Sequence, residues 1–189
     1  FKYWTYDWRI SFDKSSKYEG WDSKGYRKRF FKVAGSVFPN ENIKISSDFR
    51  IKKEKEWLNW IDGNHLAAYD LNQRIFSINL DWFRGAKHEI RFKSQFVALE
   101  AKNPRSLNTD LSGFLSASEK TVKSFSNGIT SFQIRYKYEI VPLSSIYVVY
   151  TKGGNVYEEE DDRSFSSIFK DPWENPDNEI FFLKVRLKF

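Results

Sequence analysis

The sequence predicts an all-β fold: an antiparallel up-and-down transmembrane β-barrel with eight strands visible. Three observations predict it. Apolar and polar residues alternate over segments of about ten residues, short and long connections join these segments in turn, and 19% of the 189 residues are aromatic. Alternation is expected where successive side chains of a strand meet two environments, and membrane barrels carry aromatic girdles. Residues 1–189 are expected to form one domain, either a whole barrel or the C-terminal part of a larger one.

The first half of the chain supplies four predicted strands. In the first of them, Trp4 and Tyr6 alternate with Thr5 and Asp7, which is the clearest alternation in the chain. A turn rich in Pro and Asn, residues 39–41, separates the second strand from the third. The four strands are predicted at about 3–13, 26–38, 42–56 and 65–81.

The alternation is weakest over residues 53–74. There the charged run Lys53-Glu54-Lys55-Glu56 passes into Trp57-Leu58-Asn59-Trp60, and the apolar positions slip. A β-bulge places an extra residue in one strand and would cause such a slip. Strands that project beyond a membrane would also explain it, and both interpretations stay open.

The second half supplies four more strands, predicted at about 88–100, 129–141, 145–152 and 178–189. Short turns are expected at 82–87 and 142–144, and long polar loops at 101–128 and 153–177. In bacterial barrels the short turns face the periplasm and the long loops face outside. Residues 146–151 are β-branched and aromatic but apolar on both faces, so their orientation is not readable from the sequence.

The last strand alternates apolar and basic residues and ends on an aromatic. One face carries the apolar set, and the other carries Lys184, Arg186 and Lys188. A terminal Phe preceded at every second position by apolar residues resembles the signal that directs assembly of bacterial outer-membrane barrels. The residues of this assembly signal are Phe181, Leu183, Val185, Leu187 and Phe189.

The opposite face of the strands is polar and mostly basic. Arg9, Lys32, Lys44 and Arg50 belong to it, with the acids Asp7, Asp48, Glu89 and Glu139. Two interpretations stay open: ion pairs that fill a closed eight-stranded barrel, or a wider channel that attracts anions. The candidate lumen-facing basic residues are Arg91, Lys93, Arg135, Lys137, Lys184 and Arg186.

Two stretches carry a resemblance to a known family. Residues 87–99 (KHEIRFKSQFVAL) and 133–154 (QIRYKYEIVPLSSIYVVYTKGG) resemble the C-terminal barrel of an uncharacterised family of Gram-negative outer-membrane proteins. The resemblance implies that a carbohydrate-binding-like β-sandwich precedes the barrel in a longer protein. The absence of Met and the start at Phe1 lead us to expect a processed or truncated product. The family has no assigned catalytic residues to carry over.

Enzymatic chemistry is not predicted. His65 and His88 are expected as polar residues on opposite rims, too far apart to share a site, and the chain has no Cys. The acidic run 158–162 is interpreted as a solvated loop, and Gly153-Gly154 as a turn, not a phosphate-binding loop. No catalytic residue, metal site or cofactor is therefore predicted.

Composition limits the remaining classes. No run approaches the ~20 apolar residues of a helical span, and mean hydropathy is −0.63. The net charge is +6, yet the charges alternate with apolar residues, so nucleic-acid binding is not expected.

The sequence predicts a porin-like, non-enzymatic protein of the bacterial outer membrane, acting as a pore or a membrane anchor. Anion preference and carbohydrate-related uptake are the expected forms of transport. The expected partners are outer-membrane lipid, the barrel assembly machinery, and an anionic or carbohydrate solute. The alternative is a soluble lipocalin-like β-barrel that binds a small apolar ligand, with its apolar faces inward.

Overall fold

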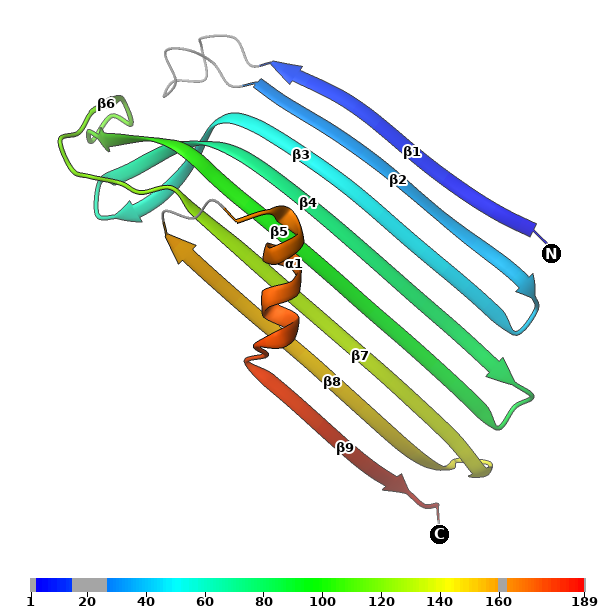
Figure 1. Ribbon diagram of the computed structural model, residues 1–189. Coiled ribbons are helices and arrows are strands. Elements are labelled where there is room, and N and C mark those ends of the chain that lie inside the picture. The colour runs from blue at the N-terminus through cyan, green and yellow to red at the C-terminus, as the bar shows by residue number, and fades with distance from the viewer. Residues whose placement is uncertain (1–2, 15–26, 160–162, 189) are drawn as a thin grey trace.

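The computed structural model describes residues 3–14, 27–159 and 163–188 (Figure 1). Within these ranges the chain forms one nine-stranded antiparallel sheet whose long strands lie side by side in chain order, with one helix in the last connection. The first four strands are β1 (Tyr3–Lys14), β2 (Arg27–Asn40), β3 (Ile43–Asp62) and β4 (His65–Arg84). They are followed by β5 (His88–Thr109), β6 (Leu115–Ala117), β7 (Phe125–Val141), β8 (Ser144–Glu159), α1 (Phe165–Glu174) and β9 (Asn178–Arg186).

The predicted antiparallel up-and-down order is confirmed, and each of the eight predicted strands has a counterpart. The long loops are where the prediction was wrong. β5 continues to Thr109, and β8 continues to Glu159, so much of 101–128 and 153–177 is regular structure. Backbone hydrogen bonds extend a ladder regardless of whether its side chains alternate in polarity. The predicted turn at Gly153-Gly154 is therefore also wrong, because both glycines lie inside β8.

The helix α1 was not predicted. It is ten residues long and contains Pro172, and its N-cap Ser164 accepts a hydrogen bond of 3.3 Å from the backbone N–H of Ser167. A short helix of this kind is marginal alone. Its inner side carries Phe165, Ile168, Phe169, Pro172 and Trp173, which pack on the sheet.

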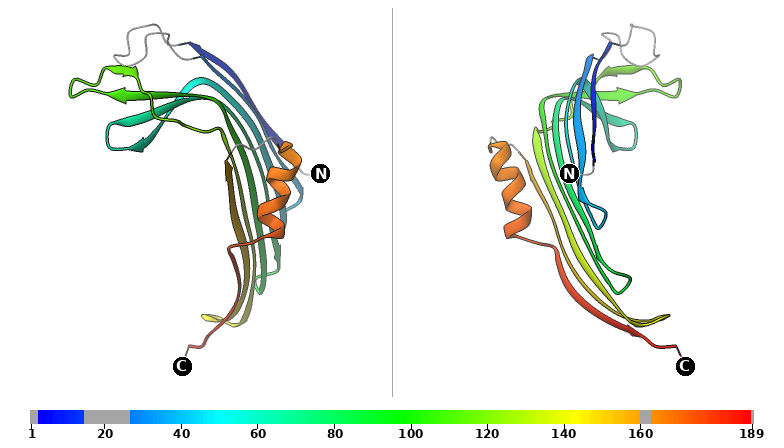
Figure 2. Two further views of the ribbon diagram at one scale, coloured as in Figure 1. Left: turned by 60° about the vertical axis from the view of Figure 1, so that its left-hand side comes forward. Right: turned by 90° about the vertical axis from the view of Figure 1, so that its right-hand side faces the viewer.

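The sheet is curved, and α1 lies on its convex face: in the right-hand view of Figure 2 both ends of the sheet bend away from the helix. We call the other side the concave face. We call the strand ends at the β3–β4 hairpin the upper ends, as they are drawn in Figure 2. The bend near these ends coincides with register shifts between Glu54 and Trp57 and between Ala68 and Asp70. Glu56 and Asn103 have positive φ angles of 63° and 53° there. The pairing register thus shifts within residues 53–74, as the bulge interpretation expects.

A small apolar core closes the upper concave face. Ala67, Tyr69 and Ala101 are at most 3% exposed, and Trp57 and Phe125 pack against them. The Tyr69 and Phe125 rings meet edge to face at 5.2 Å. Period two along β5 puts Ala101 on the same face as Lys93 and Gln95, so the concave side is apolar at its upper end and polar below.

The sheet is open. β1 pairs only with β2, and β9 pairs only with β8, so two edges remain at opposite sides of the sheet (Figure 1). Every residue of β9 is exposed. A closed barrel of eight strands is not what the described residues form.

Candidate functional site: the concave polar face

Two neighbouring rows of residues cross the whole sheet and differ in polarity on every long strand except β9. The register of the strands places one residue of each long strand in each row. The first row is apolar and lies on the convex face: Trp4, Val37, Ile45, Leu80, Phe92, Ile134, Tyr150 and Phe181. The next row lies on the concave face and is polar except at its last member: Thr5, Ser36, Ser46, Asn79, Lys93, Gln133, Thr151 and Ile180.

The register places all six predicted basic residues on the concave face. Arg91 is directly opposite Arg135, and Lys93 is opposite Gln133. Tyr147 on β8 has Lys137 on one side and Lys184 on the other. Arg186 lies opposite Ser145, whose other neighbour is Glu139.

Two carboxylates on this face each hold two cations. Glu89 Oε1 lies 2.6 Å from Arg91 Nε and 2.7 Å from Arg135 Nη2. Asp48 lies 2.5 Å from Arg50 Nε and 3.8 Å from Lys32 Nζ. Each carboxylate restrains two basic side chains on neighbouring positions. A second acid adjoins each group of three, because Asp7 also contacts Lys32 and Asp81 Oδ1 lies 3.8 Å from Arg91 Nε, so the formal charges of each group are balanced.

Further ion pairs surround these two groups. Lys32 Nζ is 2.5 Å from Asp7 Oδ2, and Lys137 Nζ is 3.5 Å from Glu139 Oε2. Among the described residues no ion pair reaches Lys93, Lys184 or Arg186. Basic side chains therefore outnumber acidic ones on the polar face. Some of the basic side chains have no acidic partner among the described residues.

A hollow of about 420 Å³ adjoins the Asp48 group and has Asp48, Arg50 and Lys93 in its lining. A second hollow of about 380 Å³ adjoins it and shares Asp48 and Asn79. Both floors consist mainly of uncharged hydrogen-bonding side chains, which the sequence analysis did not single out. These residues could have been found in the sequence as the uncharged polar positions of the alternating segments. The residues of the larger hollow are Asp48, Arg50, Ser77, Asn79, Lys93, Ser94, Gln95, Ser131 and Gln133.

The predicted assembly signal lies at the edge strand. Phe181, Leu183 and Val185 are 69%, 58% and 54% exposed on the convex side of β9. Leu187 follows the end of β9, and Phe189 lies outside the described residues. The sheet thus presents an unpaired, apolar edge at this place.

On the convex face, α1 covers the upper part of the apolar surface of β5, β7 and β8. Trp173 lies 5.5 Å from the Phe132 ring and 6.4 Å from the Phe96 ring. The outer side of α1 is polar, because Lys170 and Glu174 are exposed and paired at 2.9 Å. The convex face is therefore apolar below α1 and polar where α1 covers it.

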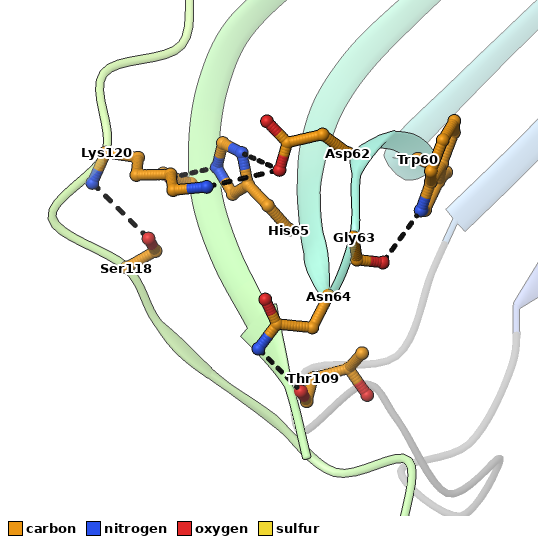
Figure 3. A network of polar contacts seen from close by, with 9 residues as sticks. Trp60, Asp62, Gly63, Asn64, His65, Thr109, Ser118 and Lys120 are labelled. Carbon is orange, nitrogen blue, oxygen red and sulfur yellow. Dashed lines mark hydrogen bonds and ion pairs between the residues drawn. The ribbon is translucent and has the colours of Figure 1, made fainter. Parts of the chain in front are cut away.

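The two histidines lie at opposite ends of the strands, as expected, but His65 is not an exposed rim residue. It is 3% exposed and shares a hydrogen bond of 2.8 Å between Nε2 and Ser106 Oγ. Its Nδ1 is 3.9 Å from Asp62, which also binds Lys120 Nζ at 3.1 Å (Figure 3). This network ties the β3–β4 hairpin to the segment after β6, which is a structural role.

The described residues contain no cluster of three or more His, Asp or Glu side chains that could hold a metal ion. No helix in the described ranges is long and apolar enough to cross a membrane. In comparisons with family models, curated proteins and solved structures, nothing matched this chain. The functional conclusion therefore depends on the two faces of the sheet.

Proposed function

We propose that the chain is a non-enzymatic β-barrel component of a bacterial outer membrane, with its convex face toward lipid and its concave face toward an aqueous lumen. The observation that carries this proposal is the pair of neighbouring rows that crosses the sheet, one apolar on all eight long strands and one polar on all of them except β9. Such alternation of apolar and polar residues is required where every strand separates hydrocarbon from water. The family resemblance of residues 87–99 and 133–154 supports the same location.

The height of the apolar surface supports a membrane position. On the convex side of β5 the uncharged positions run from Ile90 to Ala98, and Glu100 and Lys102 follow. At about 3.3 Å per residue this run is about 26 Å long before strand tilt is considered. A tilted strand needs about 9–11 residues to cross the hydrocarbon core, and the band from Ile90 to Ala98 reaches the lower end of that range.

The helix α1 sets the upper limit of this band. Lys170 and Glu174 point away from the sheet, and charged groups in contact with hydrocarbon are costly. We therefore place α1 at the level of the outer headgroups, with Trp173 and the overlying Lys152 at the interface. Aromatic and basic side chains are common at that level.

The curvature disfavours the lipocalin-like alternative. A cup for an apolar ligand needs apolar side chains on its concave face, whereas the hollows of this face are lined by Ser, Asn, Gln and charged residues. Its polar lining is suited to an anionic or carbohydrate solute, or to water in a pore. If the lumen does not conduct, the same barrel serves as an anchor.

The test is membrane assembly. Expressed with a signal peptide, the chain should be recovered in the outer membrane and migrate differently before and after boiling. Deletion of Phe189, or Phe189→Asp, should impair insertion without changing synthesis, because the terminal apolar strand is the proposed assembly signal. A chain that remains monomeric and soluble without detergent would overturn the proposal.

A further inference from the structure

We propose that Arg29, Lys53 and Arg74, on the convex face, bind the phosphate headgroup of a lipid in the outer leaflet. This inference rests on the proposed function, because it takes the convex face to be the one that meets lipid. It concerns a different face from the concave polar site. The lipid phosphate supplies a negative charge that no described residue places beside these three side chains.

The three basic side chains stand directly above the apolar surface of their own strands. On the convex side of three neighbouring strands, the last apolar residue is followed two positions further up by a basic one. The residue pairs are Phe31 and Arg29 on β2, Ile51 and Lys53 on β3, and Phe76 and Arg74 on β4. If the apolar surface meets hydrocarbon, these basic groups lie at the level of the headgroups.

The register of the strands brings the three positive charges together. Arg29 lies directly opposite Lys53. Arg74 is the diagonal neighbour of Lys53, because it pairs with Ile51, two positions from Lys53 on β3. Diagonal neighbours are within reach of long side chains, and like charges directly opposite each other destabilise a sheet. An anion bound among these side chains removes that repulsion.

The acids at this level already have other basic partners. A hollow of about 250 Å³ lies beside Lys53, and three acids contribute to its lining. Measured from carboxylate oxygen to lysine Nζ, the ion pairs of these acids are Glu54 with Lys52 at 2.7 Å, Asp70 with Lys55 at 2.6 Å and Glu100 with Lys102 at 3.7 Å. Among the described residues no ion pair reaches Arg29, Lys53 or Arg74, so their positive charge is not balanced there.

The helix α1 orients one of the three basic groups and leaves the other two uncovered. The guanidinium carbon of Arg74 lies 3.8 Å from the centre of the Phe165 ring. A guanidinium stacked on a ring keeps its N–H groups available in its own plane for a phosphate. The strands that α1 contacts are β5, β7 and β8, and the convex face of β2 and β3 lies to one side of it (Figure 1).

A lipid phosphate suits this place because the site has a charged and an apolar part. Phosphate oxygens accept charge-assisted hydrogen bonds from arginine and lysine. The acyl chains of the same lipid then lie along Phe31, Ile51 and Phe76 below. A free anion makes no use of this apolar part. Each basic residue near an anionic lipid surface contributes about fivefold to affinity.

Native mass spectrometry of the refolded protein in a neutral detergent tests the site. The probe is phosphatidic acid, and phosphatidylcholine is the comparison lipid with no net charge. We expect Arg29→Gln together with Lys53→Gln to weaken phosphatidic acid binding by at least about tenfold. Arg29→Lys together with Lys53→Arg keeps both charges and should retain binding. Removal of two opposed like charges relieves repulsion, so the glutamine variant is expected to fold.

The matched control is Lys93→Gln together with Lys184→Gln. It removes the same charge from two concave-face lysines that no ion pair reaches among the described residues. This variant should bind phosphatidic acid as the parent does. Equal losses in the two double variants would show a general effect of net charge and would overturn the inference.

Two further results would also overturn it. One is a parent protein that binds phosphatidic acid no better than phosphatidylcholine. The other is displacement of phosphatidic acid by inorganic phosphate at the same concentration, which would show an anion site that does not need a lipid. If the protein is heat-modifiable and inserts into vesicles, these results leave the proposed function intact. A chain that never inserts removes the proposed function and this inference with it.

Discussion

The backbone carbonyl oxygen of Ile168 lies directly over Gly128: a Cβ built on residue 128 would be 2.2 Å from it. The neighbouring strand repeats the arrangement, because a Cβ at Gly154 would be 2.1 Å from the carbonyl oxygen of Pro172. Pro172 has no N–H, so the Ile168 carbonyl oxygen cannot accept the usual hydrogen bond from the residue four positions later. Two glycines on adjacent strands thus define where α1 docks.

Substitution of Gly154 should displace α1 from the sheet. Gly154→Ala places a methyl group against backbone that cannot yield without moving the helix, and we expect a loss of about 1–3 kcal/mol in the free energy of unfolding. Urea titration of the refolded protein and proteolysis around residues 163–177 measure this. Gly153→Ala is the matched control, because its Cβ meets no atom closer than 3.4 Å. Equal losses for the two variants would contradict the docking.

The strands could be predicted from sequence because alternation is a local property. Most of the predicted strands show their own period of two, which also placed Arg91, Lys93, Arg135 and Lys137 on one face. The helix could not be predicted this way, since its stability comes from contacts with strands that are distant in sequence.

The orientation of residues 145–152 also depends on its neighbours. Val149 lies on the concave face because it is opposite Arg135 on one side and Phe182 on the other. For the same reason the sharing of Glu89 by two arginines could not be read from the sequence. It requires the register between β5 and β7.

A basic residue on the convex face should be poorly tolerated. Ile134→Arg lies in the apolar row and should cost about 2–4 kcal/mol near the bilayer midplane, measured as the folding free energy in phospholipid vesicles. Gln133→Arg on the adjacent, concave position is the control and should cost less than about 1 kcal/mol. Equal costs at the two positions would show that the convex face does not meet lipid.

The Asp70 carboxyl should make stability depend on pH in the acid range. Burial by itself would raise its pKa, but hydrogen bonds from Lys55 (2.6 Å) and Asn103 (2.9 Å) outweigh this and hold the pKa below its usual value. This residue lies at the bend, above the apolar band.

The direction of this pH dependence follows from the lowered pKa of Asp70. The contribution of Asp70 is complete above its unfolded pKa of about 4 and is lost as pH falls through the lower folded value. Asp70→Asn should therefore be less stable than the parent at pH 7, and the difference should shrink toward pH 2. Urea unfolding at a series of pH values measures it. A difference independent of pH would contradict the ionic role of the carboxylate.

The excess of cations on the concave face predicts anion preference if the closed barrel conducts. Rings of basic side chains select anions in pores, and Glu89 neutralises part of the charge of Arg91 and Arg135. Glu89→Gln should therefore raise the preference for chloride over potassium, whereas Arg135→Gln together with Arg186→Gln should lower it. Reversal potentials in planar bilayers under a salt gradient measure both, and the opposite signs control for general damage to the barrel. If the fully assembled protein gives no conductance in the bilayer, the pore proposal is excluded and the membrane-anchor proposal stays. An assembled barrel that does not conduct has no open lumen in which these basic side chains could select anions.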